Sequence, residues 1–248
     1  MPSDTIRTPW YWEPFDLFRD AGPEARGAFF DRSIRQTYAK GQNVFMASDA
    51  GKRAFFLERG VVKIFNLSEV GTQTIFWYCM PGDVFGAGGI TGSAQQSVYA
   101  QVTEPSIIHS LSRPDFEGVM TRHPQLAINM VRLMGARLRL ACDSLVAVAE
   151  QRTEARLARV LLRLAHNYGV PDGDGIVLGM RLSHQELADM IACTRQTVNA
   201  LLHDFSDAGW IRLDGRTIAI VSSSALQRIG DGLEGLGERT TMSVRAAG

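Results

Sequence analysis

The segment 182–210 constrains the fold more than any other part of this chain, because it specifies two short helices joined by a tight turn. Ser183 can cap a helix, and Glu186 three residues later completes a capping box. Apolar residues at helical spacing predict one buried face, made by Leu187, Met190 and Ile191. The small residues 192–194 predict a turn, after which Thr194 can cap a second helix.

The second helix is predicted to have an apolar face and a polar face. The apolar face comprises Val198, Leu201, Leu202 and Phe205. Gly209 is the signal that ends this helix. The segment 211–220 then predicts a hairpin with Asp214-Gly215 as its two-residue turn. Helix, turn, helix and hairpin together predict a winged helix-turn-helix.

The polar face at the start of the second helix indicates what this motif binds. Arg195, Gln196 and Asn199 share one side of the helix. Arg can form two hydrogen bonds with guanine, and Asn or Gln can pair with adenine edges. A helical pair that only packs, or that binds protein, does not need this trio at the helix start. We therefore predict that these three side chains contact DNA bases.

The charge of the chain argues against DNA binding. The whole sequence has 26 basic and 26 acidic residues, and the region 150–220 has eight arginines against nine acidic residues. DNA-binding domains commonly carry an excess of basic residues. The contact with DNA must therefore be a local stripe of donors, and non-specific affinity should be low. Binding of a protein through the same motif stays open as an alternative.

Residues 30–112 predict an all-β domain. The β-rich stretches, which glycines separate, are 44–46, 54–57, 61–65, 74–78 and 106–109. This pattern favours a jelly-roll. Metal enzymes with that fold need clustered histidines, but His109 is the only histidine in the region. We expect no metal site, and because the chain shows no catalytic constellation we expect no enzyme.

Residues 115–150 predict one long helix with a coiled-coil seam. Apolar residues from Ala127 onward are spaced alternately four and three residues apart, as at the a and d positions of a heptad. We predict a parallel homodimer with the interface Val131, Met134, Leu138, Ala141, Leu145 and Val148. The alternative is a helix packed on its own domain. Both can hold on different faces, because Leu133, Leu140 and Val146 lie off the seam.

Several motifs of the chain are shared with one known family. The most specific are CTRQTV at 193–198 and GWI at 209–211, followed by the hairpin. Further matches are ERG at 58–60, and PGD at 81–83 ahead of Phe85-Gly86. Over residues 30–222 the chain resembles the Crp/Fnr family of bacterial transcription regulators. The resemblance implies an α+β fold with an N-terminal β-roll of the cyclic-nucleotide-binding type, a long dimerisation helix and a C-terminal winged helix-turn-helix.

This resemblance divides the chain into five parts. They are an aromatic N-terminal arm (1–28), a β-roll sensor domain (29–115), the dimerisation helix (116–150), the winged helix-turn-helix domain (151–225) and a flexible tail (226–248). We expect the arm to pack on the domain that follows it, with partner binding as the alternative. Residues 153–168 predict an amphipathic helix, and residues 169–175 a flexible loop.

The resemblance also assigns roles to the DNA-reading residues. It matches Arg195 to the family's guanine-reading arginine, whereas Gln196 stands where many members have Glu and Ala200 where some have a second Arg. The preferred half-site should therefore differ from the common one. The expected phosphate contacts are Ser183, His184, Gln185, Thr194, Thr197 and Arg216. The dimer should read an inverted repeat in double-stranded DNA, with RNA polymerase as a further partner.

An effector pocket is implied in the β-roll. Family members that bind cyclic AMP hold the ribose with Glu and the phosphate with an Arg-Ser pair. Here Ala87 stands at the Glu position, Gln96 stands at the Arg position, and Ser97 alone matches. Burying a phosphate without a cation is costly, so we expect no useful binding of cyclic nucleotides. The candidate pocket comprises Phe85, Gly86, Ala87, Gln96, Ser97, Arg137, Leu138 and Cys142.

The cysteines bear on cofactors and compartment. The chain has only Cys79, Cys142 and Cys193, so the four-cysteine cluster of the family's iron–sulfur branch is not expected. The family's haem branch takes axial ligands from the β-roll, for which Cys79, Met80 and His109 are candidates. We expect no cofactor, with a haem sensor, or a redox sensor through Cys142, as the alternative. No apolar leader and no membrane-length apolar run is visible, which predicts a cytoplasmic protein.

Overall fold

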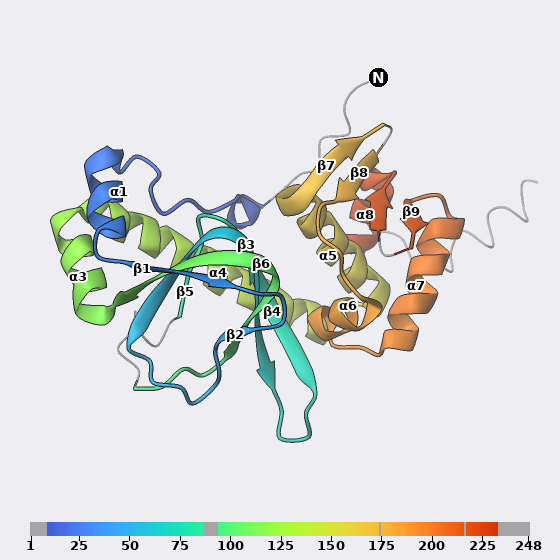
Figure 1. Ribbon diagram of the computed structural model, residues 1–248. Coiled ribbons are helices and arrows are strands. Elements are labelled where there is room, and N and C mark those ends of the chain that lie inside the picture. Colours follow the sequence, from blue (N-terminus) through green and yellow to red (C-terminus); the bar gives the residue numbers. More distant parts are fainter. Residues whose placement is uncertain (1–8, 87–93, 174, 216, 233–248) are drawn as a thin grey trace, which may run out of the picture. The chain divides into compact units, whose positions relative to one another are not determined.

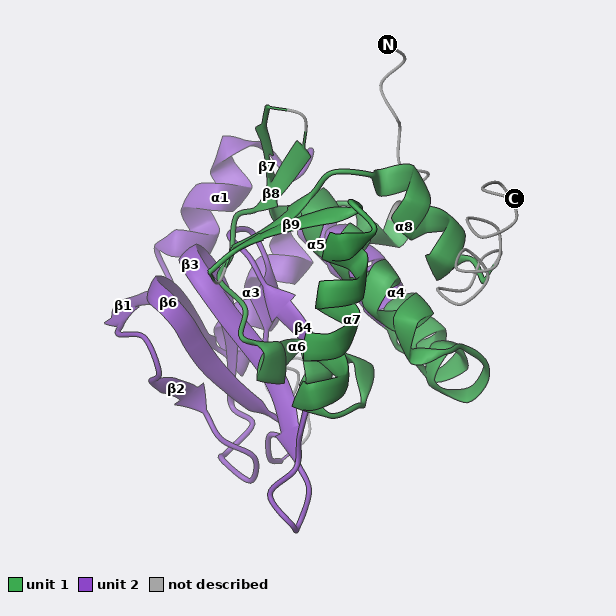
Figure 2. Ribbon diagram, turned by 90° about the vertical axis from the view of Figure 1, so that its right-hand side faces the viewer, with its two compact units in different colours: residues 1–14, 138–248 green, residues 15–137 purple. Residues whose placement is uncertain are grey.

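The computed structural model describes residues 9–86, 94–173, 175–215 and 217–232, and its elements are labelled in Figure 1. The chain forms two compact units, coloured in Figure 2. The first unit comprises residues 15–137 (purple, labelled unit 2 in the figure), and the second comprises residues 1–14 and 138–248 (green, labelled unit 1). No helix in the described part of the chain is long and apolar enough to span a membrane.

The first unit is built on an antiparallel sheet. Its strands are β1 (Ile34–Tyr38), β2 (Asn43–Phe45), β3 (Arg53–Leu67), β4 (Gln73–Cys79), β5 (Val84–Phe85) and β6 (Tyr99–Ser112). The order is β1-β6-β3-β4, with β2 paired to β6 and β5 paired to β3. Alternating apolar residues fill the interior, among them Leu57, Ile64, Ala100 and Ile108, which are almost fully buried. The predicted all-β domain is confirmed.

Two predicted strands form one. The stretches 54–57 and 61–65 both belong to β3, and the register to β6 shifts around Arg59 and Val61. Gly60 makes this irregularity possible, because its φ of +98° is a conformation that favours glycine. A Cβ at Gly60 would lie 2.1 Å from Oγ of Ser106 on the neighbouring strand, so no other residue fits. The strand therefore continues through the irregularity instead of ending there.

This unit has a second hydrophobic core, apart from the one that contains Leu57 and Ile64, and helices contribute to it. α1 (Gly22–Phe30), α3 (Arg113–Arg122) and the first half of α4 (Pro124–Glu150) pack their apolar residues with Phe56 of β3. Leu17 and Phe18 join the same core. The predicted arm therefore packs on the following domain only from Phe15 onward. Residues 9–14, with the 3-10 helix η1 (Trp10–Trp12), belong to the other unit.

The predicted helix 115–150 is two helices. α3 ends at Arg122, and α4 begins at Pro124. Between them, His123 has φ −125° and ψ +77°. Proline has no N–H to continue the hydrogen-bond ladder, and its ring disfavours the helical conformation in the residue before it. Only the seam-bearing part of the prediction, from Pro124 onward, is one continuous helix.

The second unit contains a helical core and a small sheet. Its further helices are α5 (Thr153–Tyr168), α6 (His184–Ile191), α7 (Arg195–Asp207) and α8 (Ser223–Gly230). Its strands are β7 (Gly169–Asp172), β8 (Gly175–Leu178), β9 (Ile211–Asp214) and β10 (Thr217–Ile220), in the order β7-β8-β10-β9. The amphipathic helix predicted at 153–168 is confirmed as α5, and Leu157, Leu161 and Leu164 are almost fully buried.

The loop predicted at 169–175 is wrong. It contains β7 and the start of β8, which pair from Gly169 with Leu178 to Asp172 with Gly175. β8 also pairs with β10, so the hairpin extends the sheet of the wing. The run Ile176-Val177-Leu178 has the β-branched and apolar residues that strands prefer. Its partner strand lies some forty residues later in the chain, beyond the reach of a local pattern.

The flexible tail predicted from residue 226 is wrong for residues 226–230, which belong to α8. Ser222 caps α8 by accepting a hydrogen bond from the backbone N–H of Ala225. Leu226 and Ile229 are almost fully buried, and α8 packs on α5. The predicted domain boundary at 225 therefore cuts through a helix that completes the core, and residues 233–248 of the predicted tail lie outside the described residues.

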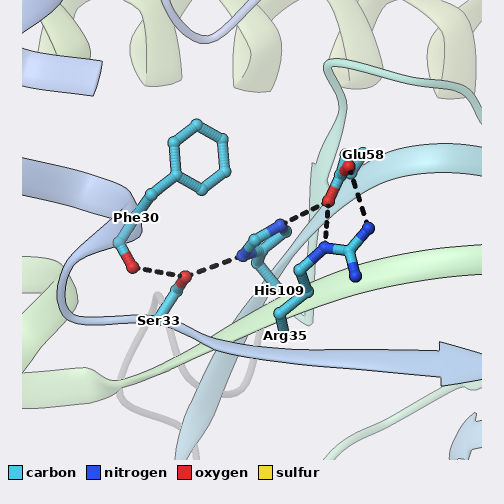
Figure 3. Close-up of polar contacts among 5 residues, drawn as sticks. All are labelled: Phe30, Ser33, Arg35, Glu58 and His109. Atoms are coloured by element: carbon cyan, nitrogen blue, oxygen red, sulfur yellow. Dashed lines mark hydrogen bonds and ion pairs between the residues drawn. The ribbon is translucent and has the colours of Figure 1, made fainter. Parts of the chain in front are cut away.

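A chain of polar contacts ties three neighbouring strands of the first unit together (Figure 3). Arg35 of β1 donates to Glu58 of β3 from Nε at 2.9 Å and from Nη2 at 3.3 Å. Nε2 of His109, on β6, lies 2.7 Å from the same carboxylate, and its Nδ1 lies 2.7 Å from Oγ of Ser33. The hydrogen bonds from Arg35 and His109 lower the pKa of Glu58 to about 2.

The charge of Glu58 should therefore contribute to stability in a defined pH range. A lowered pKa in the folded state gives stability that is present above the unfolded value of 4.5 and is lost as the pH falls toward about 2. Glu58→Gln should be less stable than the wild type at neutral pH, and the difference should shrink below pH 4.5. Urea unfolding of both proteins across this pH range measures the difference in their free energies of unfolding. The control is Glu69→Gln, at an exposed hairpin position; a difference that grows on acidification would contradict the assignment.

Candidate nucleic-acid interface

Both helices of the helix-turn-helix begin with the predicted caps. Oγ of Ser183 accepts from the backbone N–H of Glu186 at 3.2 Å, and Oε2 of Glu186 accepts from the backbone N–H of Ser183 at 2.9 Å, which is a complete capping box. Oγ1 of Thr194 accepts from the backbone N–H of Thr197 at 3.1 Å. Ala192 makes the turn with a φ of +52°, which costs a residue with a Cβ some strain.

The two helices are held by a shared core. Leu187 and Ile191 of α6 are almost fully buried, as are the inward residues of α7, namely Val198, Leu202 and Phe205. The ring of Trp210 lies 5.4 Å from that of Phe205 and covers the end of this core. Two predicted members of the buried faces are different: Met190 of α6 and Leu201 of α7 are only half-buried. In α6, Ala188 and Asp189 are buried instead. The buried face of α6 is thus rotated from the prediction by part of a turn.

The structure brings the predicted base-reading residues to one exposed surface. Arg195, Gln196 and Asn199 are all exposed at the start of α7. Within the described residues none of the three side chains makes a hydrogen bond or an ion pair. Their donors and acceptors therefore face water and need no rearrangement to meet base edges. His203, also exposed and one turn beyond Asn199, extends the same face; the spacing of four residues was the signal that sequence reasoning missed.

The side chains predicted to contact phosphates differ in whether a hydrogen-bond donor remains available. The hydroxyl of Ser183 already donates to Glu186 Oε2 at 2.9 Å, so it is the least available. The amide of Gln185 donates to Asp189 Oδ1 at 2.7 Å, which leaves one of its two N–H groups. The hydroxyls of Thr194 and Thr197 lie 2.8 Å apart, so one of their two protons stays available. His184 is half-buried, and Arg216 lies outside the described residues.

The turn of the wing is displaced by one residue from the prediction. Asp214 pairs with Thr217, so it ends β9 and the loop starts at Gly215. Gly215 has a φ of +57°, which suits the first position of a tight hairpin turn. The predicted turn Asp214-Gly215 had the right chemistry but the wrong register, because strand pairing decides which residues remain outside the ladder.

Helix α4 has two apolar faces. On one, Leu126, Leu133 and Leu140 are buried within the chain. On the other, the predicted seam is uncovered: Val131, Leu138 and Leu145 are 72%, 68% and 72% exposed. The remaining seam residues, Met134, Ala141 and Val148, are exposed as well. Packing on its own domain is therefore confirmed for one face of the helix, and the dimer seam stays a prediction for the other.

The predicted effector residues are divided between the two compact units. Phe85 is a core residue whose ring stacks on Phe55 at 5.5 Å, and Gln96 is buried. Gly86 is buried with a φ of +87°, Ser97 is exposed, and Ala87 lies outside the described residues. Leu138 and Cys142, both exposed, belong to the other compact unit.

Arg137, the only cation predicted for that pocket, is engaged in the first unit. Its Nη2 lies 3.1 Å from Oδ2 of Asp83, and its guanidinium lies over the ring of Trp77 at 4.9 Å. Asp83 is 6% exposed and would be costly to bury without this partner. Arg137 therefore neutralises a carboxylate of its own chain.

The surroundings of the three candidate haem ligands bear on whether they could bind iron. Both ring nitrogens of His109 have partners, Ser33 and Glu58. Burial raises the pKa of the Cys79 thiol to about 12, so it stays protonated, and a thiolate is the form that binds iron. Within the described residues no group of three or more His, Cys, Asp or Glu side chains is placed to hold a metal ion. Met80 is half-buried.

Two family models match this chain. They are the cyclic nucleotide-binding domain, over residues 35–123, and the Crp-like helix-turn-helix domain, over residues 155–229. The chain belongs to the Crp/Fnr family of transcription regulators. The fold, the helix-turn-helix and the DNA-binding regulator predicted from the sequence are thereby confirmed.

Relatives within the Crp/Fnr family cover most of the chain. The CRP-like cAMP-activated global transcriptional regulator of Mycobacterium tuberculosis is 27% identical over 213 residues, which is 86% of this chain and 95% of that protein. The global nitrogen regulator of Nostoc is 29% identical over 206 residues, 82% of this chain and 92% of that protein. Both are regulators and not enzymes by name.

Solved structures show the same fold. The c-di-GMP responsive global regulator CLP of Xanthomonas campestris superimposes with a TM-score of 0.70 at 18% identity, over 80% of this chain and 99% of that one. The Crp/Fnr architecture of a β domain, a long helix and a winged helix-turn-helix is thus retained at low identity.

Proposed function

We propose that this Crp/Fnr regulator acts as a homodimer that reads an inverted-repeat operator through α7. The observation that carries the proposal is the combination of two exposed surfaces. One is the apolar seam of α4, and the other is the trio Arg195, Gln196 and Asn199, whose polar groups have no partner within the described residues. A dimer explains both surfaces, because it covers the first and presents two copies of the second.

The seam is well suited to a second copy of itself. Val131, Leu138 and Leu145 are large and apolar, and a monomer would leave them in water along more than four turns of one helix. Together with Met134, Ala141 and Val148 they are spaced alternately three and four residues apart, which is the spacing of knobs packing into holes. Because the same stripe occurs on each copy, two parallel helices related by a two-fold axis bury it fully.

The dimer is tested by placing charge in the seam. Leu138→Lys with Leu145→Lys brings four positive charges into one apolar interface, and each unpaired buried charge costs several kcal/mol. The double variant should sediment as a monomer and lose operator binding. The matched control is Val70→Lys with Val170→Lys, which adds equal charge at positions that are 88% and 58% exposed and lie off the helix. A seam variant that stays dimeric in the ultracentrifuge removes the proposal.

We further propose that Arg195 reads a guanine, while Gln196 and Asn199 favour adenines nearby. Because the overall charge is zero, phosphate contacts supply little general attraction and base contacts must supply the preference. The half-sites should be centred about one helical turn apart, roughly 10–10.5 bp. RNA polymerase is the proposed partner of the DNA-bound dimer.

Arg195→Ala tests the base contact. It should cost about 1–3 kcal/mol on the selected operator and relax the preference at one base pair only. His184→Ala, at a proposed phosphate contact, should weaken all sequences alike. Titrations on the operator and on its single-base variants, at one salt concentration, measure both. If Arg195→Ala weakens every variant equally, Arg195 contacts the backbone instead.

For the effector, we propose a small molecule other than cyclic AMP, or none. Gln96 is a neutral amide where a phosphate-binding arginine would be needed, and Arg137 is paired with Asp83. A guanidinium binds phosphate far more strongly than an amide does. Titration calorimetry with cyclic AMP should show no binding in the micromolar range. A micromolar affinity would refute this proposal and leave the DNA-reading proposal intact.

A further inference from the structure

We infer that Tyr11 and Asp143 are positioning residues for DNA reading: they brace the junction between α4 and α5 and so set the half-site spacing that the dimer accepts. The inference rests on the proposed reading of an inverted repeat by a homodimer. All the residues concerned lie in one compact unit, which contains residues 1–14 and 138–248.

The junction itself is short and poorly constrained by its backbone. α4 ends at Glu150 and α5 begins at Thr153. Arg152 is extended, with φ −65° and ψ +153°, so the helical hydrogen bonds do not cross the junction. Such residues at element ends can absorb changes in φ and ψ. The seam lies before this junction and the reading helix after it, so the angle here decides where the reading helix of each copy lies.

A single carboxylate gathers three elements at the junction. Asp143 of α4 accepts a hydrogen bond from the hydroxyl of Tyr11 in η1. Its Oδ2 lies 3.8 Å from Nη2 of Arg159 on α5, and its Oδ1 lies 3.1 Å from Nε of Arg139 on α4. The Asp143 side chain is only 19% exposed, so water screens these contacts incompletely. Burial, followed by the contact with Asp143, raises the pKa of Tyr11, which keeps its hydroxyl a donor.

The segment that carries Tyr11 is fastened to α5 independently. Trp12 is 8% exposed, and its ring lies 6.5 Å from that of His166 on α5. Oε1 of Glu13 lies 3.9 Å from Nε2 of His166. Burial of an indole is a large apolar contribution, so η1 stays on α5 while Tyr11 reaches α4. The segment therefore spans the junction as a brace.

Arg156 carries the geometry of the junction to the helix-turn-helix. From α5, its Nη1 donates to the carbonyl of Gln151 at 2.9 Å, and its Nε donates to the carbonyl of Ile191 at 3.0 Å. Ile191 is the last residue of α6. One guanidinium thus joins the junction to the end of the first helix of the motif. Tyr11, by contrast, belongs to η1 and lies outside the helix-turn-helix, so we expect its loss to leave the reading surface itself unchanged.

The test compares operators that differ only in the spacing of their half-sites. One added base pair moves a half-site by about 3.4 Å and rotates it by roughly 35°. A dimer with a braced junction cannot move its second reading helix to the displaced half-site, whereas a dimer with a loose junction can. The proteins are the full-length wild type, Tyr11→Phe and Asp143→Asn. The matched control is Tyr38→Phe, which removes a hydroxyl that donates to Gln36 on β1. Fluorescence anisotropy gives the affinity for each spacing and for a single half-site, and thermal melts check folding.

The expected result is specific to positioning. A hydrogen bond to a carboxylate is worth about a factor of ten in an equilibrium, so Tyr11→Phe should reduce the discrimination between spacings by about that factor. Asp143→Asn should do the same, while Tyr38→Phe matches the wild type. Affinity for a single half-site should be equal in all four proteins.

Three outcomes would overturn the inference. If Tyr11→Phe and Asp143→Asn keep the wild-type discrimination, the contacts are structural only. If half-site affinity falls while the discrimination stays, the residues support the reading surface and not its position. A wild type that binds the inverted repeat no more tightly than a single half-site refutes the dimeric reading itself, and the inference with it, so the two failures are distinguishable.

Discussion

The central constraint in this protein is that one helix has to satisfy two apolar surfaces at once. The face of α4 that carries Leu126 and Leu133 is covered by the helices and strands of its own chain. The face that carries Val131 and Leu138 is left uncovered. Removal of the first from water stabilises the protomer, and exposure of the second is a free-energy cost that only a partner relieves. In the proposed dimer, folding and association are therefore separate uses of one element.

The buried pair of Asp83 and Arg137 lies at the point on α4 where the first compact unit ends. An ion pair in such a place contributes less to net stability than apolar residues of the same size would. It fixes the helix in one rotational setting, however, because a slip of one residue would leave a buried carboxylate without its cation. The stacking of Arg137 on Trp77 adds a second directional contact. The separation between the two faces of α4 is thus maintained by chemistry as well as by packing.

Local signals predicted the parts of the fold that depend on near neighbours. The caps at Ser183 and Thr194 were visible because donor and acceptor lie three residues apart. The seam of α4 and the inward face of α5 were visible as periodic patterns. The single exposed face formed by Arg195, Gln196 and Asn199 followed from their spacing alone.

Contacts between distant residues could not be predicted in this way. β8 is a strand because β10 pairs with it, and the Gly- and Asp-rich sequence beside it suggested a loop. α8 looked like part of a polar tail until α5 supplied the surface that buries Leu226. The engagement of Arg137 by Asp83, 54 positions earlier in the chain, was equally invisible. Pro124 is the exception, because a proline is a local signal of a helix boundary. The prediction missed it because the heptad pattern that follows favoured one long helix.

The three thiols differ so much in their surroundings that the protein carries a natural attachment point for a spectroscopic probe. Cys79 is fully buried with a pKa of about 12, and burial also raises the pKa of Cys193. Cys142 alone is exposed, and it lies next to Ala141 of the seam. Because thiolates react with maleimides and buried thiols do not, a fluorophore added at neutral pH goes to Cys142 in preference to the half-buried Cys193 and not to Cys79. In the proposed dimer, energy transfer between two such labels then follows subunit exchange without any change to the sequence.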